Sequence, residues 1–219
     1  PFTIEVLKAT LKDDRMNIKN PFKVLNPNSK TKISENITLE FVHTTHSTPQ
    51  TVLAVLHTPA GKIMYGNDFK LDNHPIIGKR PNYKRIEELG KEGMKLLIVD
   101  ALYSHESIKT PSENLAREML EDVMMHTPNE GKLIIATTFA SHIARLKSII
   151  TYGKKLNRKI VIFGRSMNKY ISSAEKAKII NLSEGVELFK YGPQVKKKLK
   201  EIQKNPGKYL VICTGHQGE

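Results

Sequence analysis

One histidine and two carboxylates each follow an apolar segment in the first half of the sequence. His46 lies in the run HTTHS (residues 43–47), Asp68 lies in YGNDFK (65–70), and Asp100 follows the run LLIV. Imidazole and carboxylate groups at neighbouring strand ends can share a cation such as zinc. The competing interpretation is that His46 hydrogen-bonds within its loop and Asp68 caps a turn. The spacing alone does not decide between the two.

Asp100 has a further chemical option because it ends an apolar run that is typical of a buried strand. A carboxylate at the mouth of a sheet can orient a metal-bound histidine, or it can hold a proton for the reaction. Its structural alternative is to cap a helix or a turn. Other histidines show no HxH or HxxxH spacing and give no reason to expect a metal role, namely His57, His74, His105, His126 and His216.

Three turns in the second half have the composition of phosphate-binding turns. They are FASH (139–142), FGRSM (163–167) and CTGHQGE (213–219), and each follows an apolar run. Backbone amides in such turns bind phosphate well when helix N-termini assist them, and Arg145 and Arg165 add positive charge. Each turn is also compatible with an ordinary tight connection. Their repetition at one edge of one predicted sheet favours phosphate. The run KKK at 196–198 is instead typical of a solvated helix face.

The elements that must position these residues change in character along the chain. Apolar spacing predicts a helix over 3–14, and β-branched runs separated by Asn, Pro and Gly then predict a sheet. The predicted strands are 22–25, 37–43, 51–57 and 62–65, followed by a loop at 71–81, a helix at 82–94 and a strand at 95–99.

After Asp100, predicted helices alternate with predicted strands. The helices are 112–125, 142–156, 167–180 and 194–203, and the strands are 132–139, 159–163 and 209–213. Alternation of this kind predicts a parallel sheet covered by helices, and ligands approach the carboxyl ends of such strands. We therefore predict two domains, residues 1–104 and residues 105–219.

The positive charge is concentrated in the second half. The 219 residues carry a formal net charge of +13, but residues 1–130 hold 17 Lys and Arg against 17 Asp and Glu, whereas residues 131–219 hold 18 against 5. Such asymmetry indicates a surface that faces a polyanion, because cations near a phosphate backbone release condensed counterions. A generally lysine-rich composition is the alternative explanation.

Composition excludes several classes of protein. A hydrophobic fraction of 39% supports a globular core, and no apolar run approaches the roughly 20 residues of a membrane helix. The single cysteine, Cys213, excludes an intrachain disulfide and a cysteine-rich zinc knuckle. The first residues lack the features of a signal peptide, so we expect a cytoplasmic protein. The first residue, Pro1, and the glycine-rich turn that precedes Glu219 lead us to expect a fragment of a longer chain.

Six motifs in a fixed order carry a resemblance to a known family. They are THSTPQT, YGNDFKLD, LLIVDALYS, TTFASHIARL, VIFGRSM and ICTGHQGE. Together they resemble the ribonuclease J family of metallo-β-lactamase-fold nucleases, which carry an inserted β-CASP domain. The resemblance implies an α/β fold in which residues 1–104 form part of a metallo-β-lactamase αββα core. Residues 105–219 then form a parallel three-layer β-CASP domain.

The same resemblance implies roles for individual residues. His46 and Asp68 match family positions that bind a pair of zinc ions, and Asp100 matches an acid of the catalytic site. Asn67 stands where the family usually has Gly, and Ala101 replaces the usual Ser. The residues expected to contact RNA are Ser141, His142, Arg145, Arg165, Ser166, Gly215 and Gln217.

The upstream HxHxDH motif of the family matches none of the eight histidines in this sequence. The family's later histidine motifs would lie beyond Glu219. The resemblance implies that the parent protein is a zinc-dependent ribonuclease that trims single-stranded RNA from the 5′ end, with endonuclease activity as an additional option and homodimerisation left open. The fragment itself is expected to be inactive. Alternatives are a non-catalytic RNA-binding module, a relative that acts on DNA, and an endonuclease for messenger RNA 3′ ends.

Overall fold

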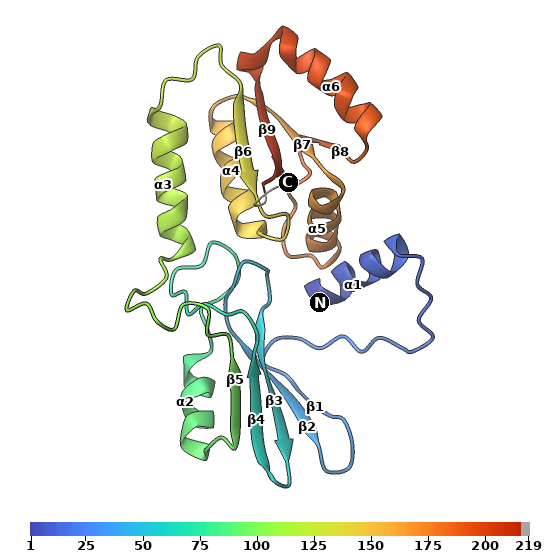
Figure 1. The fold of residues 1–219 in the computed structure, drawn as a ribbon, viewed down its shortest axis with the longest axis vertical. Helices are drawn as coiled ribbons and strands as arrows, with labels where there is room; N and C mark the ends of the chain where they lie inside the picture. The colour runs from blue at the N-terminus through green and yellow to red at the C-terminus, as the bar shows by residue number, and fades with distance from the viewer. Residues whose placement is uncertain (216–219) are drawn as a thin grey trace. The chain divides into compact units, whose positions relative to one another are not determined.

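The computed structural model describes residues 1–215 and divides the chain into two compact units (Figure 1). The first unit consists of residues 21–114 together with Pro1, and the second consists of residues 2–20 and 115–219. Each unit has one β-sheet, so the chain has the expected α/β character. Among residues 1–215, no helix has both the length and the apolar character needed to cross a membrane.

The sheet of the first unit is mixed and has the strand order β1-β2-β3-β4-β5. Its first three pairings are antiparallel, and β4 pairs with β5 in parallel. Strands β2, β4 and β5 therefore all end at the same edge of the sheet. The strands are β1 (Lys30–Lys32), β2 (Thr38–His43), β3 (Val52–Thr58), β4 (Gly61–Gly66) and β5 (Leu96–Val99).

A single helix, α2 (Tyr83–Glu92), covers the core of this sheet. Side chains that alternate along the strands point to one face, so Val42, Val55 and Met64 lie together and pack with Leu89 of the helix. The carbonyl oxygen of the Asn82 side chain accepts a hydrogen bond from the amide of Arg85 at 3.2 Å and so begins the helix.

The sheet of the second unit is parallel throughout and has the order β6-β9-β7-β8. Its strands are β6 (Ile134–Thr138), β7 (Lys159–Phe163), β8 (Val186–Phe189) and β9 (Tyr209–Thr214). The helices that follow residue 110 are α3 (Glu113–His126), α4 (Ile143–Lys155), α5 (Arg165–Lys176), α6 (Gly192–Lys204) and the short 3₁₀ helix η1 (Pro206–Lys208).

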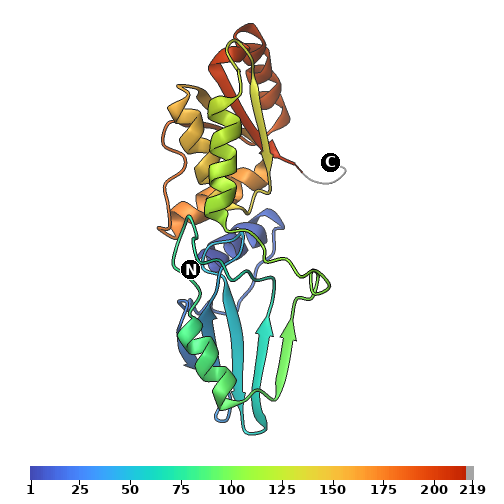
Figure 2. The same cartoon turned by 90° about the vertical axis from the view of Figure 1, so that its left-hand side faces the viewer.

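Helices cover both faces of the parallel sheet, as Figures 1 and 2 show. On one face, Val161 and Val211 pack with Ile202 of α6. On the other face α4 approaches so closely that a Cβ atom at Gly153 would lie 2.5 Å from a methyl group of Leu210. This arrangement of helix, sheet and helix confirms the prediction of a three-layer parallel domain.

The first helix, α1 (Phe2–Asp13), packs against α5 of the second unit. The Phe2 side chain is 2% exposed, and its ring centroid lies 6.3 Å from that of Tyr170. Lys169 also forms an ion pair of 2.8 Å with Asp13. The division into compact units thus differs from the division at residue 104 drawn from the sequence. That domain boundary stays a prediction, because compactness and family membership are different properties.

One predicted strand was wrong, two strands were missed, and one side chain expected at the surface is buried. Residues 22–25 form no strand, and Phe22 and Val24 are 40% and 50% exposed, because no neighbouring strand pairs with this Pro-flanked segment. The sequence also gave no prediction of β1 or β8. Lys198 was expected on a solvated face, but it is 6% exposed and pairs with Glu187 at 2.9 Å.

Candidate functional site

The three residues singled out for metal or acid chemistry all lie at one edge of the first sheet. His46 follows the end of β2, Asp68 follows the end of β4, and Asp100 comes directly after β5. Because these three strands run in the same direction, the topology brings the imidazole and both carboxylates to the same edge. Hydrogen-bonding from the Asp100 amide to the Gly66 carbonyl oxygen, at 3.2 Å, extends the β4–β5 pairing to this point.

A short antiparallel bridge joins the segments that carry His46 and Asp68. It pairs Thr45 with Lys70, and the Lys70 amide donates a 2.7 Å hydrogen bond to the Thr45 carbonyl oxygen. The Thr45 hydroxyl donates a second hydrogen bond to the Lys70 carbonyl oxygen. The two loops are therefore held side by side by backbone contacts.

All three side chains are exposed, and two of them make local hydrogen bonds. The Nδ1 atom of His46 lies 3.0 Å from the Ser47 hydroxyl oxygen, and the Asp100 carboxylate accepts a 3.0 Å hydrogen bond from the amide of Leu102. These contacts are the ones expected if His46 only hydrogen-bonds within its loop and Asp100 only caps a turn. Each side chain still has a free imidazole nitrogen or carboxylate oxygen.

The donor chemistry of these three side chains suits zinc, but the described residues show no formed metal site. One imidazole and two carboxylates are donors that zinc accepts. Within residues 1–215, however, no group of three or more His, Cys, Asp or Glu side chains is arranged so that it could hold a metal ion. A catalytic zinc site needs its three protein ligands around one point, and the three side chains at this edge are not arranged in that way.

Asp72 was not singled out in the sequence, yet it organises the loop after Asp68. Its side chain is buried, and its carboxylate accepts hydrogen bonds from the amides of His74, at 2.8 Å, and Glu113, at 2.7 Å. Its own amide donates to the Thr45 hydroxyl at 3.0 Å. Asp72 therefore connects the HTTHS segment, the following loop and the start of α3. The only sequence signal was its place in the YGNDFKLD motif.

A buried ion cluster supports the sheet behind this edge. The Glu40 carboxylate is 3% exposed and receives two hydrogen bonds from the Arg85 guanidinium, at 2.7 and 3.0 Å. His57 lies 2.7 Å from the same carboxylate, and Lys30 lies 3.2 Å from it. Burial alone would raise the pKa of Glu40, but hydrogen bonds from Arg85, His57 and Lys30 outweigh it and lower the pKa to about 2.

Two of the predicted turns of the second unit, those after β6 and β7, lie at the carboxyl edge of its parallel sheet. Ser141 and His142 follow β6, and the Nδ1 atom of His142 accepts a hydrogen bond from the Arg145 amide at 3.4 Å, which caps α4. Arg165 and Ser166 form the exposed first turn of α5 after β7. Since all four strands are parallel, these turns share one edge.

Gly215 follows β9 at the same edge. Its amide lies 3.4 Å from the carbonyl oxygen of Thr138, and a Cβ atom at position 215 would lie 2.6 Å from the Cβ of Thr137. Only glycine fits this close approach of two chain segments. Gln217, the remaining residue expected to contact RNA, lies outside the described residues.

Strand β8 adds two residues to this edge that the sequence analysis missed. Lys190 and Tyr191 follow the end of β8, and the Tyr191 side chain is 60% exposed. An exposed aromatic ring beside a cation is a common surface for stacking a nucleic-acid base. The apolar pattern in VELF (186–189) was the signal that could have revealed the strand.

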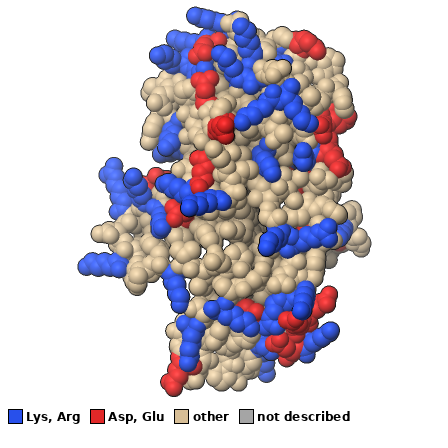
Figure 3. All heavy atoms as spheres, turned by 180° about the vertical axis from the view of Figure 1, so that it is seen from behind, with Lys and Arg blue, Asp and Glu red and all other residues tan. Residues whose placement is uncertain are grey.

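The second unit also has an excess of positive side chains. Residues 131–219 hold 18 Lys and Arg against 5 Asp and Glu. Figure 3 shows one face of the molecule, on which Lys and Arg side chains are interspersed with a smaller number of acidic ones. The edge of the parallel sheet therefore belongs to a unit that attracts polyanions.

Sequence comparisons connect this geometry with known proteins. Residues 130–219 match the family model described as "Ribonuclease J, beta-CASP domain". The full chain aligns with ribonuclease J of Pyrococcus abyssi at 42% identity and with ribonuclease J of Methanocaldococcus jannaschii at 41% identity. This chain is a ribonuclease J relative.

Other ribonuclease J sequences match less of it. The Thermus thermophilus protein is 32% identical over 90% of this chain. The chain spans about half the length of the archaeal relatives, 49% of each. The relationship thus extends over the first unit as well as the matched β-CASP segment.

A solved structure shares the fold. It is described as a protein of unknown function from Enterococcus faecalis, and it matches 98% of this chain and 63% of its own chain with a TM-score of 0.50. The sequence identity is 15%, so the match concerns the fold alone.

Proposed function

We propose that the protein to which this chain belongs is a zinc-dependent, cytoplasmic ribonuclease that degrades single-stranded RNA from the 5′ end, with endonuclease activity as an additional option. The observation that carries the proposal is the convergence of His46, Asp68 and Asp100 at one sheet edge, in a chain related to ribonuclease J along its length. In this proposal His46 and Asp68 are metal ligands, and further ligands come from the part of the relatives that this chain does not span.

The residues of this chain have distinct tasks in the proposed reaction. Zinc would supply electrophilic stabilisation of the phosphodiester. Asp100 is exposed at the same edge as the ligands and accepts the proton of the attacking water. The positive charge of Arg145 and Arg165 balances the RNA phosphates, and the backbone amides of the turns after β6 and β7 fix the path of the strand.

The chain of 219 residues is proposed to lack catalysis by itself. The described residues offer no group of three side chains arranged for a metal ion, and the two proposed ligands, His46 and Asp68, are fewer than the three protein ligands of a catalytic zinc site. We expect no chelator-sensitive cleavage of RNA by the purified 219-residue chain.

A second candidate is a non-catalytic RNA-binding module. The basic excess of residues 131–219 and the incomplete donor set among the described residues both favour it. The affinity of this module for RNA would come from electrostatic attraction to the phosphate backbone. The affinity would therefore fall steeply as the salt concentration rises, and binding would need no metal.

Metal content and RNA cleavage distinguish the two candidates. The measurement compares the full-length gene product with the 219-residue chain on 5′-monophosphorylated RNA, with and without a chelator. His46→Ala and Asp68→Ala are the test variants, and His105→Ala, at an exposed histidine in the loop after β5, is the matched control.

The ribonuclease proposal expects bound zinc, cleavage that the chelator stops, and loss of both in the two test variants. His105→Ala should cleave like the unmodified protein. A full-length product that is metal-free and inert, yet binds RNA with a steep salt dependence, would replace the enzyme with the binding module.

A further inference from the structure

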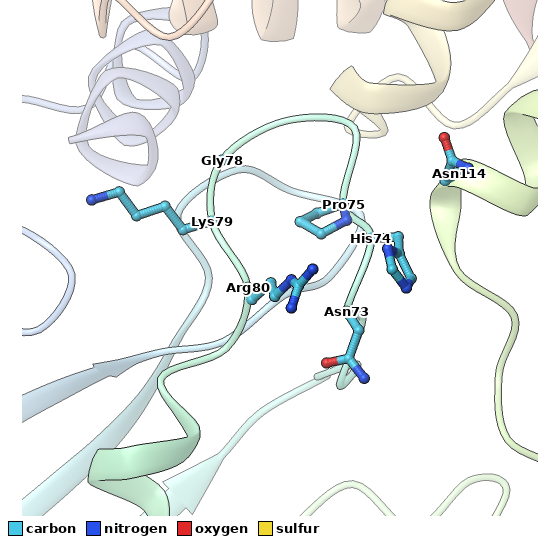
Figure 4. A pocket seen from close by; sticks show the side chains of 7 residues that line it. All are labelled: Asn73, His74, Pro75, Gly78, Lys79, Arg80 and Asn114. Carbon is cyan, nitrogen blue, oxygen red and sulfur yellow. The ribbon is translucent and has the colours of Figure 1, made fainter.

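The loop between β4 and α2 encloses a pocket in the first unit that the proposed chemistry does not use. The pocket has a volume of about 550 Å³ and is lined by Asn73, His74, Lys79, Arg80 and Asn114 among others (Figure 4). Figure 4 shows the loop curving around the space, with Arg80 on one side and His74 and Asn114 on the other. Its side-chain groups are cationic, imidazole or amide.

Hydrogen bonds at both ends hold this loop in place. At its start, Asp72 accepts from the amides of His74 and Glu113, which fixes the positions of His74 and of the turn that bears Asn114. At its end, the Nε2 atom of His43 donates to the Lys79 carbonyl oxygen at 3.0 Å. The pocket is therefore a preformed part of the unit.

The charges around the pocket are uncompensated. Across residues 1–215, the side chains of Lys79 and Arg80 make neither a hydrogen bond nor an ion pair, and both are exposed. The carboxylate of Asp72, at the start of the loop, is buried and already engaged by two backbone amides and by Lys70. The Oδ1 atom of Asn73 accepts from the Tyr83 hydroxyl at 2.8 Å, which leaves its amide nitrogen as a donor. A pocket of free cations and donors suits an anion.

We propose that this pocket binds a phosphate group of a single-stranded RNA that runs to the sheet edge bearing His46 and Asp68. The loop leaves that edge directly, because Lys70, which bridges to Thr45, precedes it and His43 anchors its far end. An exposed site attracts one free phosphate ion weakly in water, whereas a strand that is held at several phosphates gains from each of them. The inference rests on the proposed function for the identity of the strand.

The experiment measures the anisotropy of a labelled oligouridylate bound to the 219-residue chain over a range of salt concentrations. Arg80→Gln and Lys79→Gln each remove one charge from the pocket. Lys91→Gln removes the same charge from an exposed position in the last turn of α2 and is the matched control. Circular dichroism of each variant confirms that the fold is unchanged.

The proposal expects Arg80→Gln to weaken binding several-fold and to reduce the slope of log affinity against log salt by about 0.7, the value for one phosphate contact in a single strand. Lys91→Gln should leave both quantities unchanged. Equal affinity and slope for Arg80→Gln and the unmodified chain would overturn the proposal.

Inorganic phosphate distinguishes the two sources of the anion. At constant ionic strength we expect it to compete only weakly with the oligonucleotide. Phosphate binding that depends on Arg80, together with RNA binding that does not, would assign the pocket to a free ion and overturn the proposal. Since no metal takes part in this binding assay, its result is independent of the outcome for His46 and Asp68 in the nuclease assay.

Discussion

The buried carboxylate of Asp72 accepts a 2.7 Å hydrogen bond from the backbone amide of Glu113, a residue 41 positions further along the chain. It accepts a second from the amide of His74 at 2.8 Å. The Asp72 side chain thus supplies the hydrogen-bond acceptor for two backbone amides, neither of which is paired within a β-sheet. The loop at the candidate metal edge and the pocket beside it depend on the same carboxylate.

Replacing Asp72 by Ala should lower the free energy of unfolding by about 1–3 kcal/mol, because the buried amide of Glu113 loses its acceptor. The effect is measured by urea denaturation followed by circular dichroism. Asp122→Ala is the control, because the Asp122 side chain is 79% exposed and pairs only with the exposed His126. Equal urea midpoints for Asp72→Ala and Asp122→Ala would contradict the prediction and show that water replaces the carboxylate as the hydrogen-bond acceptor.

The Glu40 cluster predicts a loss of stability in acid. The pKa of Glu40 lies at about 2 in the folded protein against an ordinary value of 4.5, so the folded state binds this proton less readily than the unfolded state. The stabilisation is therefore complete above pH 4.5 and disappears as the pH falls towards 2. Melting temperatures of the unmodified chain and of Glu40→Gln, measured across this range, should converge at the acid end. Parallel curves would contradict the prediction.

The surroundings of Lys198 predict that removing its charge alone costs less stability than removing its charge and its aliphatic stem together. Its ammonium group pairs with Glu187 and Glu201 and lies 5.1 Å from the centre of the Tyr209 ring. Lys198→Ala should cost about 2 kcal/mol or more, because it removes both the buried aliphatic stem and the cation. Lys198→Met keeps the stem and should cost less, since Glu187 and Glu201 are 45% and 54% exposed and stay hydrated.

Chemical denaturation of these two variants beside Lys197→Ala checks the prediction. Lys197 precedes Lys198 in the same helix but is exposed, so its replacement should change stability by less than about 0.5 kcal/mol. Equal losses for Lys198→Met and Lys198→Ala would assign the whole effect to the charge.

The exposed ring of Tyr191 predicts that stacking of a base on it contributes to RNA binding. Its ring is 60% exposed at the carboxyl edge of the parallel sheet, and loss of one stacked base costs about 1–3 kcal/mol. Tyr191→Ala should therefore weaken binding of the 219-residue chain to an oligonucleotide by about 5- to 150-fold, whereas Tyr191→Phe should preserve it. Tyr103→Ala, at a 63% exposed tyrosine of the first unit, serves as the control in the same titration. Loss of binding in Tyr191→Phe would assign the contact to the hydroxyl group.

The sequence predicted the strands that have a continuous apolar run or a regular alternation of apolar and polar residues. The apolar runs of β6, β7 and β9 lie in the parallel sheet, and the runs of β2 to β4 have the alternation of a sheet with one buried face. Strands β1 and β8 were missed because they have only three and four residues and include charged side chains. Residues 22–25 have the composition of a strand but find no partner strand.

The candidate site was predictable where a motif carries it. His46, Asp68 and Asp100 could be predicted to lie at strand ends because the ends of the apolar runs can be recognised in the sequence. Asp72 was not predictable, because its partner Glu113 is distant along the chain. The burial of Lys198 was not predictable either, because this helical side chain is covered by Glu187 of β8 and Tyr209 of β9.

The packing of α1 against α5 has a consequence for the order in which the chain is made. On the ribosome, α1 emerges before residues 21–114, but Tyr170 and Lys169, which it contacts, emerge only after those residues have been synthesised. Phe2, an almost fully buried side chain in the finished structure, must therefore wait exposed, or covered by a chaperone, during that interval. Helix α1 is therefore translated before the first unit but can pack only after that unit and α5 have been made.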